Sequence, residues 1–204
     1  MKHTQVQLPQ LLPDVERRLR QFESLLLRWN ARINLVSRTD ASDVWARHIM
    51  DSVQIGPLLP PGPGEIIDLG SGAGFPGLIV ALTTGRHVHL VESDQRKAAF
   101  LREAIRETNA PATVHAVRAE ALTLPPATIV TARALAPLGI LLALASPRLA
   151  QGGVCLFPKG ATVDDELTAA ANEWHMRLER FQSRTSASAT ILRISEIRRA
   201  GHAI

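Results

Sequence analysis

The sequence predicts an α/β protein built on a mostly parallel β-sheet, because short β-type runs alternate with helical stretches through most of its 204 residues. The β-type runs cover 65–69, 87–92, 113–118, 128–132 and 153–157, and the helical stretches cover 76–84, 94–108 and 136–149. A glycine-rich turn at 70–77 follows the first run, and a proline- and glycine-rich linker at 60–64 precedes it. We therefore expect an N-terminal helical extension over 1–60 and a ligand-binding domain over 61–204, joined in one compact unit.

The segment before the linker has the apolar spacing of two helices. In the first helix, apolar residues recur at intervals of three and four, and Pro13-Asp14 is a typical start signal. These apolar residues are Val15, Leu19, Phe22, Leu26, Trp29 and Ile33. The second helix is expected to begin after Ser42 or Asp43, and Pro57 ends it.

The glycine-rich turn is the strongest functional signal. Gly70, Gly72 and Gly74 lie between an apolar run and a helical stretch, and Asp68 stands two positions before the first glycine. Glycine permits positive φ and leaves room for a ligand near the backbone, where a helix N-terminus favours nucleotide-like groups. Asp-x-Gly-x-Gly-x-Gly is typical of S-adenosylmethionine (SAM) sites. The window Gly72–Gly77 also satisfies G-x-G-x-x-G, so a dinucleotide site and a purely structural turn remain open at this point.

Polar residues at the ends of the other β-type runs are the next candidates. Parallel strands bring their carboxyl ends to one crevice, where α/β proteins bind ligands. Glu92 ends the second run, where either cofactor class needs a carboxylate for its ribose hydroxyls. The later runs are followed by Arg118-Ala119-Glu120, by Arg133 and by Pro158-Lys159-Gly160.

The last forty residues have a different pattern. A helix is expected over 163–174, followed by two β-type runs at 175–182 and 189–197. Two consecutive runs without an intervening helix indicate a hairpin, which we place at the edge of the sheet.

Composition bounds the class of protein. With 46% hydrophobic and 21% charged residues, the chain is expected to be soluble and to have a sizeable core. Its single cysteine, Cys155, lies in an apolar run and is expected to be buried, so no disulfide forms within the chain. We find no signal peptide or bilayer-spanning run, and we expect a cytoplasmic protein.

Charge is distributed unevenly around the net value of +4. The central part, 51–170, has nine basic and eleven acidic residues and is slightly acidic, whereas 1–50 and 171–204 each carry a net charge of +3. This pattern suits a cationic cofactor in the centre and a phosphate-rich partner at the ends. The chain has no tyrosine and only 4% aromatic residues, which argues against a general single-strand stacking platform.

Several segments in register resemble the bacterial small-subunit ribosomal RNA guanine-N7 methyltransferases, the RsmG family, also called GidB. Residues 29–35 (WNARINL) are similar to its WNxxINL segment, and residues 47–52 (RHIMDS) to its RHxxDS segment. The turn at 70–77 resembles the family's glycine motif. The later blocks of the family are similar to Glu92 with 96–101, to 118–120 and to 133–134. The resemblance covers roughly residues 25–160, in the family's order and spacing.

This resemblance implies methyl transfer from SAM to N7 of a guanine in the 530 loop of 16S ribosomal RNA, guanine 527 in the usual rRNA numbering. It implies 16S RNA or the 30S subunit as partner. It also implies a class I SAM-dependent methyltransferase (Rossmann-like) fold, with a mostly parallel seven-stranded sheet whose last strand is antiparallel, preceded by N-terminal helices. Because N7 of guanine has a free lone pair at neutral pH, no general base is assigned.

Residue roles follow from the same resemblance and from the strand-end positions. The expected cofactor-binding residues are Asp68, Gly70, Gly72, Gly74, Phe75, Glu92, Ala119, Glu120 and Arg133. The candidates on the substrate side are Arg133, Arg47, His48, Asn34 and Lys159.

Two other functions stay open from the residues alone. A small NAD(P)-dependent oxidoreductase would use Gly72–Gly77, but it needs an acid such as tyrosine near the nicotinamide, and the chain has none. A non-catalytic RNA-binding or assembly factor with a SAM-like fold is the second alternative. The histidines have no metal-ligand spacing along the sequence, so no metal is expected, and a monomer is the default expectation.

Overall fold

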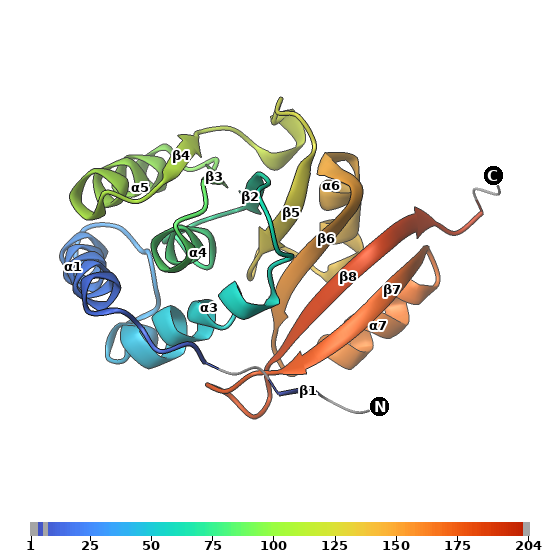
Figure 1. Cartoon of the computed structure of the whole chain (residues 1–204), viewed down its shortest axis with the longest axis horizontal. Coiled ribbons are helices and arrows are strands. Elements are labelled where there is room, and N and C mark those ends of the chain that lie inside the picture. The colour runs from blue at the N-terminus through green and yellow to red at the C-terminus, as the bar shows by residue number, and fades with distance from the viewer. Residues whose placement is uncertain (1–3, 6–7, 202–204) are drawn as a thin grey trace.

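The computed structural model describes residues 4–5 and 8–201, which form an eight-stranded sheet with helices on both faces (Figure 1). The strand order is β1-β7-β8-β6-β5-β2-β3-β4. The strands are β1 (Thr4–Gln5), β2 (Ile66–Leu69), β3 (Val88–Val91), β4 (Ala112–His115), β5 (Ala127–Ala132), β6 (Leu149–Lys159), β7 (Trp174–Gln182) and β8 (Thr190–Arg199). The last strand, β8, runs antiparallel to both of its neighbours, β6 and β7, and every other pairing is parallel. Strands β2 to β8 are the expected seven-stranded sheet, and β1 adds a short edge strand that the sequence did not predict.

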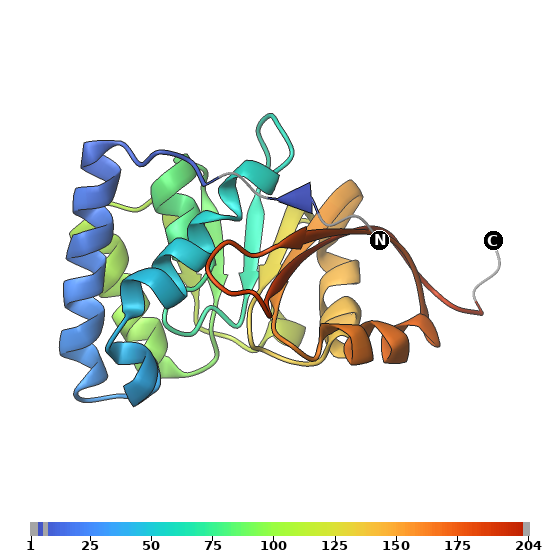
Figure 2. The same ribbon diagram turned by 90° about the horizontal axis from the view of Figure 1, so that it is seen from below.

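The helices alternate with the parallel strands as the pattern predicted. They are α1 (Pro13–Asn30), α2 (Arg38–Ala41), α3 (Asp51–Val53), α4 (Gly77–Thr84), α5 (Gln95–Thr108), α6 (Leu138–Ala145) and α7 (Val163–Ala171). Shorter 3₁₀ turns occur at η2 (Gly56–Leu58), η3 (Ala119–Ala121) and η4 (Ser146–Arg148). The predicted hairpin at the end of the chain is formed by β7 and β8 (Figure 2).

The second predicted helix is not a regular α-helix. Trp45–Met50 forms a π-helix, η1, which continues directly into the single turn α3. Apolar spacing along the sequence does not separate one wide turn from α-helical turns, so the pattern predicted a helix but not its type. Short π segments are rare in proteins, and those that do occur are often found at functional sites.

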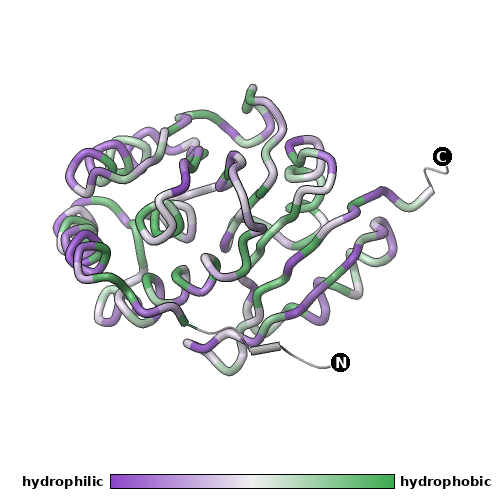
Figure 3. Tube along the Cα trace, in the orientation of Figure 1, coloured by the Kyte–Doolittle hydropathy of each residue, from purple (hydrophilic) through white to green (hydrophobic). Residues whose placement is uncertain are grey.

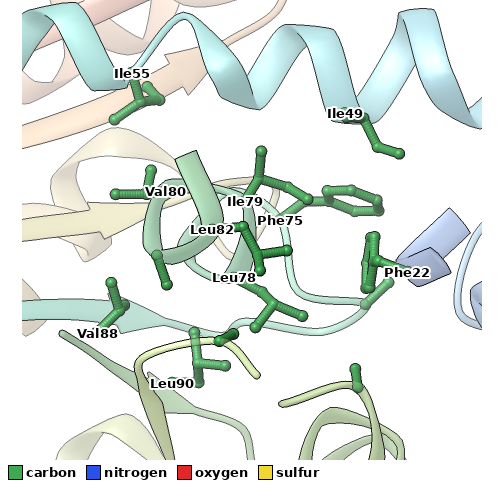
Figure 4. Close-up of a cluster of buried hydrophobic side chains, with 14 of the residues drawn as sticks. Phe22, Ile49, Ile55, Phe75, Leu78, Ile79, Val80, Leu82, Val88 and Leu90 are labelled. Atoms are coloured by element: carbon green, nitrogen blue, oxygen red, sulfur yellow. The ribbon is translucent and has the colours of Figure 1, made fainter. Parts of the chain in front are cut away.

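Two apolar layers hold the sheet, one on each face. The layer under α1, α4 and α5 contains Phe22, Phe75 and Phe100, with the rings of Phe22 and Phe75 5.6 Å apart (Figure 4). The layer under α6 and α7 contains Phe157 and Cys155, and the thiol is buried as expected. Alternate residues of β2 serve the two layers, and apolar residues are concentrated along the central strands and α4 (Figure 3).

The N-terminal helix packs on the helices of the sheet. Phe22 of α1 contributes to the same apolar layer as Leu78 of α4 and Leu101 of α5. Figure 4 shows Phe22 beside Phe75, which lies in the glycine-rich turn just before α4. Among the described residues, no helix combines the length and apolar character needed to cross a bilayer.

Candidate functional site

The glycine-rich turn connects β2 to α4 at the carboxyl edge of the sheet. Gly70, Gly72 and Gly74 all have positive φ, a backbone conformation that favours glycine. Gly77 is required for a different reason: a Cβ there would lie 2.6 Å from the carboxyl group of Asp68. The turn therefore needs glycine both for its backbone path and for close packing of α4 on β2.

Asp68 is fully buried behind this turn. Its Oδ1 accepts a 2.6 Å hydrogen bond from the hydroxyl of Thr131, its cross-strand neighbour on β5. Its backbone carbonyl accepts from the hydroxyl of Ser71, while Oδ2 lies against Gly77 without a hydrogen bond of good geometry. Burial raises the pKa of Asp68 to about 6, and the hydrogen bonds oppose this shift only in part.

Glu92 joins the end of β3 to the turn. One carboxylate oxygen accepts a 2.8 Å hydrogen bond from the backbone N–H of Gly72, and the other accepts a 2.7 Å bond from the N–H of Asp94. A carboxylate has about four lone-pair sites, so Glu92 keeps acceptor capacity for hydroxyl groups after making both bonds. It fixes the turn and still lines the space beside it.

A cavity of about 550 Å³ opens between the turn and the ends of β3, β4 and β5. This volume lies within the range of about 300–1,000 Å³ that is usual for sites of small molecules. The predicted residues that line it are Gly70, Gly72, Phe75, Glu92, Ala119, Glu120, Arg133 and His48. Asp68 and Gly74 do not line it. Asp68 is buried behind the turn, and Gly74 lies within the turn and contributes one of its positive φ angles.

Arg133 links this cavity to the π-helix. Its guanidinium donates a 3.1 Å hydrogen bond to Oδ2 of Asp51 and also donates to Nδ1 of His48. The His48 ring stacks on Phe75, with ring centroids 5.0 Å apart. Burial, followed by the adjacent Arg133 charge, lowers the pKa of His48 to about 4. His48 is therefore a neutral ring near pH 7, and because Nδ1 accepts from Arg133, its remaining proton is on Nε2.

A buried polar network continues from Asp51 to the loop between β7 and β8. The other Asp51 oxygen accepts hydrogen bonds from the hydroxyls of Ser183 and Thr185 and from the amide of Gln54. The side-chain oxygen of Gln54 in turn accepts from the backbone N–H of Arg184. Segments far apart in the sequence, the η1–α3 helix and the hairpin loop, are thus held together at the site.

A second cavity, of about 820 Å³, adjoins the first on the side of this network. The two cavities share Asp40, His48, Arg133, Ala134 and Leu135. The candidates Arg47 and Lys159 line only the second cavity. Lys159 donates to Glu166 and to the carbonyl of Ala136, so its ammonium group is already engaged. Arg47 pairs with Asp40 at 3.0 Å and remains largely exposed.

Asn34 does not join this group. It lines a separate small hollow with Arg32, Asp94 and Lys97. The neighbouring asparagine, Asn30, has the more direct structural effect, because its side-chain oxygen accepts from the backbone N–H groups of residues 35 and 36. That contact shapes the loop that carries Leu35, Val36 and Ser37 to the first cavity.

Sequence reasoning missed several lining residues. They are Leu35, Val36, Ser37, Asp40, Ser93, Lys97, Val117 and Leu135. Ser93 and Lys97 follow Glu92 and Val117 precedes Arg118, so the strand-end rule would have found them if it had been extended by a few residues. Leu35 ends the 29–35 segment that resembles the family, whereas the residues at 36–40 are far from the strand ends in sequence and carried no comparable signal.

Comparisons with known proteins agree with this geometry. A family model described as rRNA small subunit methyltransferase G (GidB) matches residues 15–193. The chain is 58% identical over 180 residues to the ribosomal RNA small subunit methyltransferase G of Rhodospirillum centenum, covering 88% of this chain and 83% of that protein. It is 57% identical over 182 residues to the protein of the same name from Granulibacter bethesdensis, covering 89% and 85%.

Solved structures of methyltransferases share the fold at low sequence identity. A ribosomal protein L11 methylase from Lactobacillus delbrueckii subsp. bulgaricus matches with a TM-score of 0.60 at 14% identity, covering 73% of this chain and 78% of that one. A tRNA (uracil-54, C5)-methyltransferase from Pyrococcus abyssi, solved with S-adenosyl-L-homocysteine, matches with a TM-score of 0.51 at 13% identity, covering 70% and 36%. These neighbours place the sheet in the class I SAM-dependent methyltransferase fold.

Proposed function

The chain belongs to the rRNA small subunit methyltransferase G family, and we propose that it transfers the methyl group of SAM to N7 of guanine 527 in 16S ribosomal RNA. Family membership makes the protein a SAM-dependent enzyme that acts on small-subunit rRNA, and it removes the oxidoreductase alternative. The observation that carries the proposal is the meeting of two cavities at His48, Arg133, Ala134 and Leu135, one beside the glycine-rich turn and one open toward the hairpin loop.

We assign the cavity beside the turn to SAM. When bound, SAM supplies a methyl group on a positively charged sulfur. The residues present fit this group: Glu92 has spare acceptor positions for ribose hydroxyls, and Gly72 leaves backbone exposed where a side chain would intrude. Val117 and Leu135, both partly exposed, offer apolar surface for the adenine, and Ala119 and Glu120 stand beside them at η3.

We assign the larger cavity to the target nucleotide. The Arg133–His48–Asp51 network lines this cavity, so an entering base would meet groups held in fixed positions. The chain needs no general base, because N7 of guanine already carries a free lone pair. The work of these residues is to align the base, and positioning of reactants contributes as much as about 7–11 kcal/mol in well-aligned systems.

Arg133 and His48 have complementary tasks at the junction. Arg133 is anchored by Asp51, so its guanidinium has a fixed direction and is suited to hold a phosphate or the edge of the base. The neutral His48 ring has a proton on Nε2, which lies 3.7 Å from Asp40 and has no hydrogen-bond partner among the described residues. Because this Nε2 atom is buried and faces the Asp40 carboxylate, we assign the His48 ring to positioning Arg133 and Phe75 at the boundary between the cavities.

We infer that the enzyme acts as a monomer in the bacterial cytoplasm, where its rRNA substrate is made. Six large hydrophobic side chains are exposed among the described residues, and two of them, Val117 and Leu135, line the proposed SAM cavity. No broad apolar face of the kind that obligate dimers bury is formed by them. Light scattering of the purified chain measures this directly.

The function is tested by transfer of a labelled methyl group from SAM to three substrates: protein-free 16S RNA, 30S subunits and transfer RNA. The label is then identified by nucleoside analysis and located by sequencing. We expect 7-methylguanosine at guanine 527 from a small-subunit substrate and none from transfer RNA. Label in another nucleoside, or at another position, would overturn the assignment while leaving the SAM site intact. Comparison of 16S RNA with 30S subunits shows which form the enzyme prefers.

A further inference from the structure

Three histidines come together on the face of the sheet opposite α4, at its β3–β4 edge. His87 precedes β3, His89 lies within it, and His115 ends β4. The carboxylate of Glu65, immediately before β2, faces the first two. Along the sequence these residues have no metal-ligand spacing, and the expectation of no metal depended on that spacing. Parallel pairing of β2, β3 and β4 is what brings them together.

We propose that Glu65, His87 and His89 form a binding site for a divalent transition-metal ion such as Zn²⁺. Oε2 of Glu65 lies 3.3 Å from Nδ1 of His87 and 3.0 Å from Nε2 of His89, and the three ligand atoms all lie within 4.8 Å of one another. Tetrahedral Zn²⁺, with bonds of about 2.0–2.1 Å, holds its ligand atoms about 3.3–3.4 Å apart. The two distances from Glu65 to the histidines are close to this value, and three protein ligands leave a fourth position for water.

Each histidine is also oriented by its second ring nitrogen. Nε2 of His87 lies 3.0 Å from the hydroxyl of Thr113, and Nδ1 of His89 lies 3.0 Å from Nε2 of His115. Metal-binding histidines usually donate their other N–H to such a partner, which fixes the tautomer and the ring direction.

The backbone that carries Glu65 is held as well. The guanidinium of Arg86 donates to the carbonyls of Pro60 and Gly64, and the carbonyl of Glu65 accepts from the N–H of Ile129. The exposed Glu65 side chain therefore extends from a fixed point. Glu65 and the three histidines His87, His89 and His115 do not line either cavity of the methyltransferase site. Glu65 and His87 precede their strands, so they lie at the end of the sheet opposite the glycine-rich turn.

The test is Zn²⁺ binding by the full-length chain, measured by competition with a chromophoric chelator. All proteins carry H3Q and H202Q, so that the two histidines outside the described residues do not contribute. We expect one Zn²⁺ per chain, and an affinity at least tenfold weaker in H87Q, H89Q and E65Q. H175Q, which replaces an exposed histidine on β7, is the matched control and should bind Zn²⁺ as tightly as the parent does. Methyl transfer should be unchanged in H89Q.

A second measurement separates a metal site from a plain hydrogen-bond cluster. Replacing the orienting group, as in H115A, should weaken Zn²⁺ binding by about 10–100-fold without changing its stoichiometry, the usual effect of losing an outer-shell partner. Co²⁺ should give visible absorption bands in the parent that are absent in H89Q. The proposal is overturned if the parent retains no Zn²⁺, or if H87Q and H89Q bind Zn²⁺ as tightly as the parent does.

Discussion

Two buried carboxyl groups near the glycine-rich turn are stabilised to different degrees. Glu92 accepts two backbone N–H groups, whereas Asp68 has a single hydroxyl donor to its carboxyl group and is completely buried. From this difference in hydrogen bonding we infer different structural roles for Glu92 and Asp68. Glu92 holds the turn and lines the cavity beside it, and Asp68 packs between β2 and α4.

Replacing Glu92 by glutamine should weaken SAM binding. The variant keeps an acceptor but loses the charge, and hydrogen bonds to charged groups are worth about 1.5–3 kcal/mol, or roughly 10–150-fold in affinity. Isothermal titration with SAM measures the change. E173Q, which replaces an exposed carboxylate beyond α7, is the control and should bind SAM as tightly as the wild type does. Equal affinities in E92Q and the wild type would remove Glu92 from the SAM site.

Asn in place of Asp68 should stabilise the fold increasingly as pH rises. Because the folded pKa of Asp68 is raised from 3.8 to about 6, its favourable contribution is complete below pH 3.8 and is lost as pH rises through 6. The D68N-minus-wild-type difference in unfolding free energy should therefore grow by about 1.4 kcal/mol between pH 5 and pH 7.5.

The difference between the two proteins is the quantity to measure for Asp68. The lowered pKa of His48 acts in the opposite direction, since stability from a neutral buried histidine increases as pH rises from about 4 toward 6.5. His48 is present in both proteins, so its effect cancels in the difference. Urea unfolding of both at several pH values provides the data. A difference that does not change with pH would mean that Asp68 is ionised in the fold throughout this range.

At the scale of elements, the structure depends on how separate segments meet. The η1–α3 helix reaches the β7–β8 loop through Gln54, whose side chain is fully buried and hydrogen-bonded at both ends. This connection places Asp51, and with it Arg133, at the boundary between the cavities. The hairpin at the end of the chain is therefore part of the site's support, although it is distant in sequence.

Removing the Gln54 side chain should destabilise the protein. Q54A removes the hydrogen bond from the Gln54 amide to the Ser183 hydroxyl and the bond from the N–H of residue 184 to the Gln54 oxygen. A net contribution of about 0.5–1.5 kcal/mol for each bond predicts a loss of about 1–3 kcal/mol. Urea denaturation measures the loss. Q95A, which removes an exposed glutamine at the start of α5, should change stability by less than about 0.5 kcal/mol. Similar values for the two variants would contradict the proposed link.

Most elements were predictable from the sequence because their patterns are local. The first four β-type runs match β2 to β5 within three residues, and the terminal hairpin was recognised from two runs without a helix between them. The sixth strand is longer than expected, 149–159 instead of 153–157, because the chain continues through an irregular pairing with β5 and a positive φ at Gly152. Apolar alternation does not reveal such a feature.

The site was predictable where it depends on strand ends and not where it depends on loops. Glu92, Arg133 and Glu120 lie at the cavity because parallel strands converge there. Lys159 also lies at a strand end, but its ammonium group is engaged by Glu166, a partner contributed by α7 that strand position does not indicate. Asn34 lines neither of the two cavities. The path of its loop is set by the hydrogen bonds of Asn30 with residues 35 and 36, which the sequence pattern does not indicate.

At the scale of the whole molecule, charge is arranged for an anionic substrate around a near-neutral cofactor cavity. The exposed arginines 47 and 118 border the two cavities, and the exposed arginines 32 and 96 line the neighbouring hollow. The net charge of +4 is small, so attraction to RNA depends on where these groups lie more than on their number. Binding of the substrate should therefore depend on salt.

Loss of one of these charges should weaken RNA binding. For R118Q we expect weaker binding to 30S subunits and a plot of log K against log salt that is less steep by about one unit, as for a single phosphate contact. R106Q removes an equally exposed arginine from α5, away from both cavities, and should behave as wild type. Filter binding across a salt series measures both. Parallel salt slopes for R118Q and the wild type would exclude the contact.

The most direct test of the account is single-turnover methyl transfer to guanine 527 of 30S subunits by E92Q and R133K, each followed to saturating SAM. In our assignment Glu92 belongs to the SAM cavity, whereas Arg133 holds the base beside it through Asp51 and His48. E92Q should therefore regain a rate close to wild type once SAM saturates. R133K, which loses the two-pronged guanidinium, should remain at least about 100-fold slower at saturating SAM, the loss expected for a misplaced reactant. Rescue of R133K by SAM, with E92Q still slow, would contradict the division of the site into these two cavities.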